Sequence, residues 1–487
     1  MVHSYLERET KLDVAANFRE PDLTGLIPAG AHIETGTEQL HSEYFDTAAT
    51  DLRAAAMTLR HRTGTADVGW HLKVPRKVGR EELHAADAPD LPDELRRLVR
   101  GVTRGAELHP VAVLATLRRV RRIRDADGVL LAEIATDDVS AAALGEPGRV
   151  STWREVEIEL GSGEEDLLYD LAAAYQDAGA FAAASWSKLD RALGRHDPET
   201  APGAVGPALN YLRKNHRRLL AGDVALRSGQ ADVVHRTRVA VRRTRSTLRT
   251  FGGLFEPGRT ARLDEELRWY AGLLGDVRDR QVLRKRYRDQ LDKLPDDLIL
   301  GPVRARIDSE LGGEQAEKWE ALVAALDSDR YMALLDELAV FVTDPPLGDK
   351  ADRPVHWLTK RRQRAERKAL QRLERASATG DAEDLHRARK AAKRARYAAE
   401  LLRPSTEGRS ARKSVKRHRR LQDMLGEHQD GHVSQGVLRR LGAKAATSSG
   451  ENSFTYGVLY GQEQARTEAV RRQVVGKTAK IPAEGGP

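Results

Sequence analysis

The pattern of hydrophobic and polar positions changes close to residue 200 of this 487-residue chain. In residues 1–160, short stretches alternate between apolar and polar side chains and are interrupted by Gly, Pro and Asp, which is typical of antiparallel strands. Residues 164–195, and nearly all of the chain beyond residue 205, repeat their apolar positions with a helical period. We therefore expect an α+β first part that contains an antiparallel sheet, and an all-α second part.

The stretch YLERETKL at residues 5–12 places its charges at every second position. If it forms a strand, Glu7, Glu9 and Lys11 all point to the same side. A solvated strand face is the simpler interpretation of this pattern, because strands at the surface commonly carry charges. The stretch alone leaves both this interpretation and an enclosed charged face open.

A second strand, TWREVEIELG at residues 152–161, repeats the design with Glu155, Glu157 and Glu159 on one face. Its other face is Val, Ile and Leu, which requires a hydrophobic core. Three carboxylates in a row repel one another, so a strand that tolerates them needs cations close by. The first part supplies such cations in the strand-like phase: Arg60, Arg62, Lys73, Arg80, Arg118, Arg119, Arg121, Arg122 and Lys188.

If these strands close into a barrel, carboxylates and Arg or Lys side chains face each other inside it. Carboxylates are ligands that Mg²⁺ and Mn²⁺ prefer, and Arg and Lys bind phosphate oxygens. Two placements stay open. In TLRRVRR, either Arg118 or one of Arg119 and Arg121 points inward, and Asp46 is either part of the site or a cap of the turn that follows its strand.

A series of motifs, taken in order, resembles the CYTH domain, also called the triphosphate tunnel metalloenzyme family. The motifs are Glu7-x-Glu9-x-Lys11, Tyr44 to Thr47, Leu59-Arg60 with Arg62, Trp70 with Leu72-Lys73, Glu133, Glu155-x-Glu157-x-Glu159, and Ser187-Lys188. The resemblance covers roughly residues 3–195. It implies an antiparallel β-barrel tunnel that hydrolyses or cyclises triphosphate compounds with a divalent metal, Mg²⁺ or Mn²⁺.

The resemblance also implies a role for individual residues. The implied metal ligands are Glu7, Glu9, Glu155 and Glu157. The implied catalytic residues are Glu7, Glu9, Lys11 and Glu159, of which Glu159 is a further ligand or the base that orients water. The implied phosphate-binding residues are Arg60, Arg62, Lys73, Arg118 and Lys188, joined by Lys11.

Charge divides the chain in the same place as the pattern does. Residues 1–200 hold 24 Lys and Arg against 35 Asp and Glu, whereas residues 201–487 hold 57 against 38, a balance of +19. A basic half of this kind indicates a polyanionic partner. Aromatic residues make up only 5% of the chain and are not interleaved with the basic positions, so nucleic acid is the weaker candidate.

The basic half contains an internal repeat at a constant offset of 151 residues. VHRTRVAVRRTRSTLRTF from Val234 aligns with LHRARKAAKRARYAAELL from Leu385, and LLGDVRD from Leu273 aligns with MLGEHQD from Met424. Each repeat forms an all-positive helical stripe, which a bound polyanion explains better than a solvated face does. The histidines could instead pack between helices. Gly-Asp/Glu-x-x-Asp is expected to form a helix turn with capping, and its acid is a candidate for orienting neighbouring Arg residues.

This half resembles the CHAD domain, a helical domain with conserved histidines, over about residues 205–480. The resemblance implies two related four-helix bundles and binding of inorganic polyphosphate. The residues expected to bind it are Arg213, Arg217, His235, Arg238, Arg242, Arg245, Arg364, Lys368, His386, Arg389, Lys393 and Arg396. In the second repeat Lys393 replaces an Arg, which removes one potential bidentate contact.

Taken together, we expect a CYTH-like barrel at residues 1–197, a linker at 198–207, and a CHAD-like domain at 208–480 with repeats of about 208–345 and 354–480. The leading hypothesis is a metal-dependent triphosphatase that also binds polyphosphate. The alternatives are a binding protein with a phosphate-sensing barrel, and thiamine triphosphatase or adenylate cyclase activity. The chain has no cysteine, no apolar run of membrane-spanning length and no signal-like N-terminus. We expect a cytoplasmic protein without a membrane partner, and polyphosphate granules are a candidate location.

Overall fold

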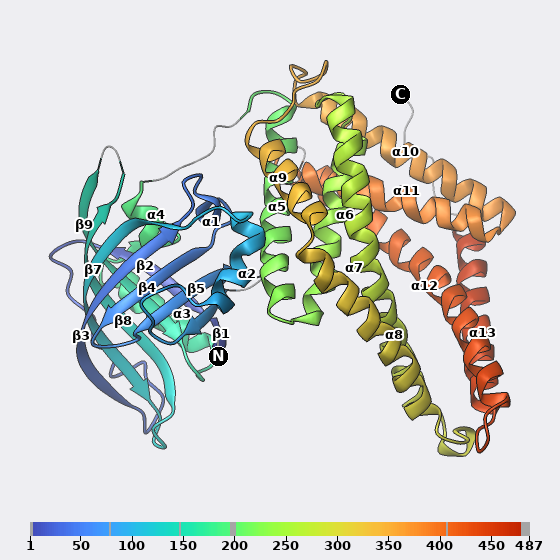
Figure 1. Cartoon of the computed structure of the whole chain (residues 1–487), viewed down its shortest axis with the longest axis horizontal. Helices are drawn as coiled ribbons and strands as arrows, with labels where there is room; N and C mark the ends of the chain where they lie inside the picture. The colour runs from blue at the N-terminus through green and yellow to red at the C-terminus, as the bar shows by residue number, and fades with distance from the viewer. Residues whose placement is uncertain (1–2, 77–78, 146–147, 195–200, 406–407, 479–487) are drawn as a thin grey trace. The chain divides into compact units, whose positions relative to one another are not determined.

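The structure is a computed structural model that describes residues 3–76, 79–145, 148–194, 201–405 and 408–478, except the side chains of residues 4–7 and 475–478. The chain divides into two compact units, residues 1–199 with 220–230 and residues 200–219 with 231–487, so one stretch of the helical region belongs to the first unit. Among the described residues, none of the helices combines the length and the apolar composition needed to cross a lipid bilayer. Figure 1 shows the elements of both units with their labels.

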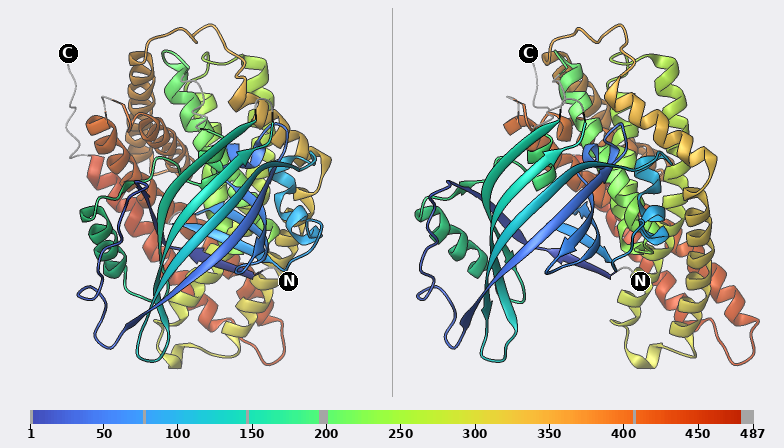
Figure 2. Two further views of the ribbon diagram at one scale, coloured as in Figure 1. Left: turned by 90° about the vertical axis from the view of Figure 1, so that its left-hand side faces the viewer. Right: turned by 60° about the vertical axis from the view of Figure 1, so that its left-hand side comes forward.

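The first unit is built on one antiparallel sheet, which has ten strands within the described residues. In spatial order the strands run β1-β6-β5-β4-β3-β7-β8-β9-β2-β10. The strands are β1 (His3–Glu7), β2 (Glu9–Val14), β3 (His32–Asp46), β4 (Thr58–Gly64), β5 (Gly69–Pro75), β6 (Arg80–Ala85), β7 (His109–Arg124), β8 (Leu130–Ala143), β9 (Arg149–Leu160) and β10 (Phe181–Ala182). The long strands β3, β7, β8 and β9 lie side by side and twist together (Figure 2). The antiparallel sheet expected from the alternating pattern is confirmed.

The N-terminal segment joins the two ends of this sheet. β1 pairs with β6, and β2 pairs with β9, yet only Arg8 separates β1 from β2 along the chain. The sheet is therefore closed into a ring by the chain itself. The expectation that YLERETKL forms one strand needs this correction: Glu7 and Glu9 belong to different strands, because the chain changes its pairing partner at Arg8.

One face of the sheet is apolar and lies under a helix. Val156 and Ile158 of β9 are fully buried in a core that also contains Leu171 and Tyr175 of α3 (Glu165–Asp177). This placement confirms the expectation that the second face of TWREVEIELG is covered. Since side chains alternate along a strand, Glu155, Glu157 and Glu159 point to the other face, into the ring.

The helix expected across residues 164–195 is interrupted. After α3, Gly179 adopts a left-handed conformation (φ 104°), and Phe181–Ala182 pairs with β2. A short helix, α4 (Lys188–Ala192), follows. Gly tolerates this backbone conformation at no steric cost, which lets the chain leave the helix and return to the sheet edge. The other helices of this unit are α1 (Asp51–Ala54) and α2 (Asp93–Thr103).

The second unit is helical throughout its described elements. The helices are α5 (Val205–Arg227), α6 (Val234–Thr250), α7 (Pro257–Leu291), α8 (Val303–Leu326), α9 (Asp329–Thr343), α10 (His356–Thr379), α11 (Ala382–Leu401), α12 (Gly408–Ala446) and α13 (Phe454–Thr478). Because α5 begins at Val205, the last residues of the predicted linker at 198–207 are helical. Pro207 lies in the first turn of α5, where a missing backbone N–H costs no hydrogen bond.

Helix positions repeat at the same offset as the sequence does. α5, α7 and α8 begin at Val205, Pro257 and Val303, and α10, α12 and α13 each begin 151 residues later. α9 follows α8 in the first repeat. The buried cluster around Tyr287 combines residues of α7, α8, α12 and α13, so helices of both repeats contribute to one core. α7 and α12, at 35 and 39 residues, are long enough to pack in their own repeat and also against the other.

Candidate functional sites

The ring of the sheet encloses a cavity lined almost entirely by charged side chains. Side chains of β2, β3, β4, β5, β6, β7 and β9 line this cavity. The charged lining consists of Glu9, Lys11, Arg60, Arg62, Asp67, Lys73, Arg80, Glu82, Arg118, Glu157, Glu159 and Lys188. Carboxylates and cations are mixed over this surface, because Lys11 lies beside Glu9 and Glu157, and Glu82 lies among the cations of β4 and β5.

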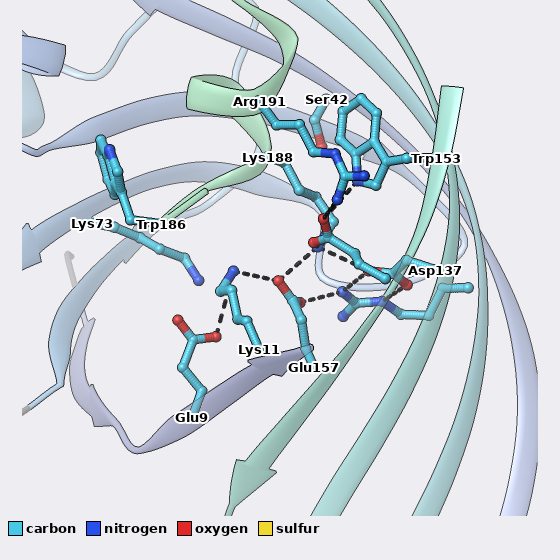
Figure 3. Close-up of polar contacts among 12 residues, drawn as sticks. Glu9, Lys11, Ser42, Lys73, Asp137, Trp153, Glu157, Trp186, Lys188 and Arg191 are labelled. Carbon is cyan, nitrogen blue, oxygen red and sulfur yellow. Dashed lines mark hydrogen bonds and ion pairs between the residues drawn. The ribbon is translucent and has the colours of Figure 1, made fainter. Parts of the chain in front are cut away.

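Two lysines connect the carboxylates of β2, β8 and β9 (Figure 3). The Lys188 ammonium lies 2.7 Å from Glu157, 2.8 Å from Glu155 and 2.9 Å from Asp137. The Lys11 ammonium contacts Glu157 and lies 3.7 Å from Glu9. Glu157 therefore sits at the centre of the network, between both lysines.

Arg118 is the inward-facing residue of the TLRRVRR strand. Its Nε and Nη2 donate to both carboxylate oxygens of Asp137 at 2.8 and 2.7 Å, and Nη2 also donates to Glu157 at 2.8 Å. Arg119 instead pairs with Asp138, and Arg121 donates to the carbonyl oxygen of Pro21. These contacts resolve the register that the sequence left open.

The environment separates the protonation states of neighbouring glutamates. Burial opposes ionisation of Glu157, but Lys11, Lys188 and Arg118 outweigh it and hold the pKa of Glu157 well below its usual value. Burial raises the pKa of Glu159 to about 7, and the negative charges of Glu9 and Glu157 act in the same direction against Lys73. Glu159 is therefore a carboxylate that can exchange a proton near neutral pH.

The opposite wall carries two arginines of β4, a lysine of β5 and a buried glutamate of β6. Glu82 accepts from Arg60 at 3.2 Å and lies 3.3 Å from the Lys73 ammonium. Arg62 donates to the Ser42 hydroxyl at 3.3 Å and pairs with Asp67. Burial, with the charges of Arg60 and Arg118, lowers the pKa of Arg62 to about 10. An anion bound beside Arg62 would relieve this repulsion.

Local structure explains how two of the motif residues are positioned. Lys188 is the first residue of α4, which Ser187 caps by accepting from the Asp190 amide at 3.0 Å. Lys188 therefore reaches the cavity from a helix. Asp46 is fully buried and accepts from the amides of Thr47, Leu52 and Arg53 at 2.8 to 2.9 Å. Its capping interpretation is confirmed.

The predicted site residues of the first unit converge on this cavity, with one outside the described structure. Glu9, Lys11, Arg60, Arg62, Lys73, Arg118, Glu157, Glu159 and Lys188 all line it, and Glu155 contacts Lys188. The side chain of Glu7 lies outside the described residues. Sequence reasoning missed Asp137, Glu82 and Asp67. The phase of β6 would have identified Glu82. Asp137 is followed by Asp138, so the sequence does not show which of the two points inward, and Asp67 lies between two strands.

The acidic side chains fit a hard divalent cation. Oxygen ligands of Asp137, Glu155 and Glu157 lie within 4.8 Å of one another, and Glu9 lies opposite Glu159 in the β2–β9 pair. Carboxylate oxygens are the donors that Mg²⁺ and Mn²⁺ prefer. The Lys188 ammonium contacts all three members of the first group, so the carboxylates gather around a positive charge in this structure.

In the second unit, the two basic stripes come together where α6 lies beside α11. The positive charges of Arg238, Arg242 and Arg389 act on Lys393, and Arg396 acts on Arg242. Burial, followed by these arginines, lowers the pKa of Lys393 to about 7. Two stripes that lie 151 residues apart in the sequence therefore form one concentrated basic cluster, Arg238, Arg242, Arg389, Lys393 and Arg396.

A glycine and an aspartate of the adjoining helix support the leading arginine of each stripe. Arg238 donates to Asp279 at 3.0 Å, and its counterpart Arg389 lies 3.5 Å from Asp430. A Cβ atom added to Gly275 would lie 3.1 Å from the Arg238 guanidinium. The Gly-Asp/Glu-x-x-Asp motif thus leaves space for each guanidinium on the helix surface and supplies an acid that orients it. The expected helix turn with capping is wrong, because Gly275 lies inside α7 and Gly426 inside α12.

The remaining predicted residues are spread around this cluster. Arg213 donates to the carbonyl oxygen of Val342 at 2.9 Å, and Arg245 donates to Asp264 at 3.1 Å. Nδ1 of His386 lies 2.9 Å from the Gln429 side-chain oxygen, so this histidine contacts the neighbouring helix, as the packing alternative expects. His235, Arg217, Arg364 and Lys368 are exposed.

Comparisons with known proteins agree with the two-part organisation. A family model described as CYTH domain matches residues 6–192, and one described as CHAD domain matches residues 210–439. An uncharacterized protein of Mycobacterium tuberculosis (strain CDC 1551 / Oshkosh) is 35% identical over 503 residues, which covers 98% of this chain and 96% of that protein. The chain therefore belongs to the proteins that join an N-terminal CYTH domain to a C-terminal CHAD domain, and its first domain belongs to the triphosphate tunnel family.

Two solved structures are also similar. PptA from Streptomyces chartreusis is 20% identical with a TM-score of 0.47, and the match covers 57% of this chain and 100% of that chain. The CHAD domain from the plant Ricinus communis is 22% identical with a TM-score of 0.42, covering 59% of this chain and 94% of that chain.

Proposed function

We propose that the CYTH domain hydrolyses inorganic triphosphate, or a related triphosphate compound, with Mg²⁺ or Mn²⁺. The observation that carries the proposal is the arrangement of Arg60, Arg62, Lys73 and Arg118 around one cavity with Glu9, Glu157 and Glu159. A triphosphate presents several negative charges in a row, and this lining offers cations for the oxygens together with carboxylates for a metal. Charged side chains that only face solvent would not be expected to line one enclosed cavity.

Within this proposal each residue has a defined task. Arg60, Arg62, Lys73, Arg118, Lys188 and Lys11 bind phosphate oxygens, while Glu7, Glu9, Glu155 and Glu157 hold the metal, which neutralises phosphate charge when bound. Glu159 orients a water and accepts its proton, for which a pKa of about 7 is suitable. The water oxygen bonds to the terminal phosphorus, the bond to the bridging oxygen breaks, and phosphate and pyrophosphate result.

We further propose that the CHAD domain binds inorganic polyphosphate through the cluster of Arg238, Arg242, Arg389, Lys393 and Arg396. The support for this proposal is that the positive stripes of α6 and α11 lie against each other, where Arg242 and Lys393 are partly buried and close to the other cations. The other predicted residues, Arg213, Arg217, His235, Arg245, Arg364, Lys368, His386, would contact more distant parts of a long chain. The same proposal includes three further points. The domains span residues 1–197 and 208–480, the helical domain consists of two duplicated four-helix bundles, and the protein is cytoplasmic.

The test is phosphate release from inorganic triphosphate, ATP, thiamine triphosphate and long-chain polyphosphate, with Mg²⁺ or Mn²⁺ and with EDTA. We expect metal-dependent release from inorganic triphosphate that disappears in Glu9→Gln/Glu157→Gln. The outward-facing Asp138→Asn is the matched control and should keep its activity. Preference for ATP with cyclic product, or for thiamine triphosphate, would instead support the cyclase or thiamine triphosphatase alternative. Tight polyphosphate binding without any release would make the barrel a phosphate sensor.

A further inference from the structure

Two histidines and an aspartate form a compact group on the inner face of the sheet. His71 of β5 lies opposite His84 of β6 in the strand register, and their ring centroids are 4.5 Å apart. Asp67 lies between β4 and β5 with a positive φ of 53°. One ligand atom from each of the three lies within 4.8 Å of the others. None of these residues is among those assigned above to metal or phosphate binding.

The hydrogen bonds of His71 leave one ring nitrogen directed into this group. Its Nδ1 lies 2.8 Å from the Glu82 carboxylate, which also contacts Arg60 and Lys73, so we assign Nδ1 as the donor. Burial lowers the pKa of His71, which favours the neutral ring with a lone pair on Nε2. A carboxylate that holds the other ring nitrogen is the usual support of a metal-binding histidine.

Electron-pair donors lie close to that nitrogen, and one of them, the Asp67 carboxylate, also pairs with Arg62. Nε2 of His71 lies 3.0 Å from the carbonyl oxygen of Asp67 and 3.8 Å from its carboxylate. Nε2 of His84 lies 3.1 Å from the carbonyl oxygen of Val68. The lone pair on Nε2 of a neutral His71 therefore faces oxygen atoms that can only accept hydrogen bonds. A cation at the centre of the group would interact favourably with that nitrogen and with these oxygens. On the next strand, β1, His3 lies opposite His84.

We propose that Asp67, His71 and His84 bind a borderline divalent transition-metal ion of the Zn²⁺ class, separate from the Mg²⁺ or Mn²⁺ of the carboxylates. Imidazole nitrogens with one carboxylate suit Zn²⁺, whereas an all-oxygen set suits Mg²⁺ or Mn²⁺. Zn–N bonds of about 2.1 Å require the three ligand atoms to move roughly an ångström closer together. Asp67 is exposed and lies in a hairpin connection, so it can make this movement.

The experiment is equilibrium dialysis of the full chain against Zn²⁺ in excess Mg²⁺, with bound zinc counted by atomic absorption. We expect His84→Ala to lose one equivalent and Asp67→Asn to weaken that equivalent at least tenfold. His61→Ala, on the same sheet, is the matched control and should lose none. His84 is only partly buried, and circular dichroism should show that its variant folds.

Two further variants distinguish this site from other places where zinc could bind. Glu9→Gln/Glu157→Gln removes carboxylates of the neighbouring cavity, and His428→Ala/His432→Ala removes a histidine pair of the second unit. We expect both to keep the equivalent that His84→Ala loses. The proposal is overturned if His84→Ala binds as much zinc as the wild type, or if the equivalent disappears in either of these two variants. A protein that lacks triphosphatase activity but still binds this equivalent of zinc would support the proposal, because the experiment measures the number of bound zinc ions and not activity.

Discussion

Asp137 and Asp138 are adjacent residues of β8 that point to opposite faces of the sheet. Asp137 is fully buried and accepts from Arg118 and Lys188, whereas Asp138 pairs with Arg154 at the surface. We expect Asp137→Asn to lower kcat/KM for inorganic triphosphate by about ten- to a hundredfold, because both cations lose the acceptor that positions them. Asp138→Asn should change it by less than about twofold. Steady-state kinetics of the pair measures the difference, and equal losses would contradict the assignment of the inner face.

The low pKa of Lys393 predicts that the polyphosphate binding proposed above depends on pH. Its pKa of about 7 means that the free protein loses this charge between about pH 6 and pH 8. We expect the affinity for polyphosphate to fall by about three- to tenfold over that range, beyond the change that other groups cause. Lys393→Arg, which restores the residue type of the first repeat, keeps the charge and should remove this part of the pH dependence. Fluorescence titrations with polyphosphate at pH 6 and pH 8 measure this change in affinity. The prediction is contradicted if the affinity changes equally with pH in the wild type and in Lys393→Arg.

The same residue affects the stability of the helical domain in the opposite direction. The pKa of Lys393 is lower in the folded protein than its ordinary value of 10.5. The unfolded chain therefore binds more protons between about pH 7 and pH 10, and stability rises with pH through that window. Sites that bind polyanions commonly gather like charges at such a cost, which the ligand then offsets.

At the scale of the element, α7 shows how a glycine in mid-helix serves a neighbouring side chain. Gly275→Leu should raise intrinsic helix propensity by up to about 1 kcal/mol, while its side chain displaces the Arg238 guanidinium, which lies 3.1 Å from the Cβ position. We expect a loss of polyphosphate affinity of about fivefold without a lower melting temperature. Gly272→Leu, one turn earlier and with open space around its Cβ position, is the control. Unchanged binding in Gly275→Leu would show that Arg238 does not need this position.

The sequence was sufficient for most elements, and its failures have physical causes. Alternation identified the strands and the inner face of β9, because a buried face on one side forces the period. The break at Arg8 was not predictable, since nothing local marks a change of pairing partner between β6 and β9. The two-residue β10 was missed because Ala-rich segments near Phe181 have a helical composition and only the partner strand makes them extended.

The candidate site was predictable where carboxylates repeat at strand period and less so where they stand alone. Glu155, Glu157 and Glu159 occur at every second position, which shows that they share one face of the strand. Asp137 does not, since it is followed by Asp138 and the pair hides which of them points inward. Zinc-type ligation by Asp67, His71 and His84 depends on strand pairing between β5 and β6, which spacing alone does not reveal.

At the scale of the whole molecule, the two domains should respond differently to charge reversal and to salt. We expect Arg238→Glu/Arg389→Glu to reduce polyphosphate affinity at least tenfold at fixed salt, while kcat/KM for inorganic triphosphate stays within about twofold. Polyphosphate binding should also fall steeply as salt rises, because it releases many counterions. Binding and turnover are measured on the same preparations. A parallel loss of turnover would show that both domains act on one phosphate chain.

The closure of the ring at Arg8 has a consequence for folding during synthesis on the ribosome. Glu9 pairs with Glu159, so the first strands to be synthesised wait for about 150 further residues before the last partner exists. At about 5–20 residues per second, that delay is roughly 10–30 s. During this time the N-terminal segment has no second strand to pair with, and the charged side chains that later line the cavity, Glu9 and Lys11, keep it hydrated. The residues that equip the tunnel for phosphate would also keep its opening strand from aggregating while the chain is incomplete.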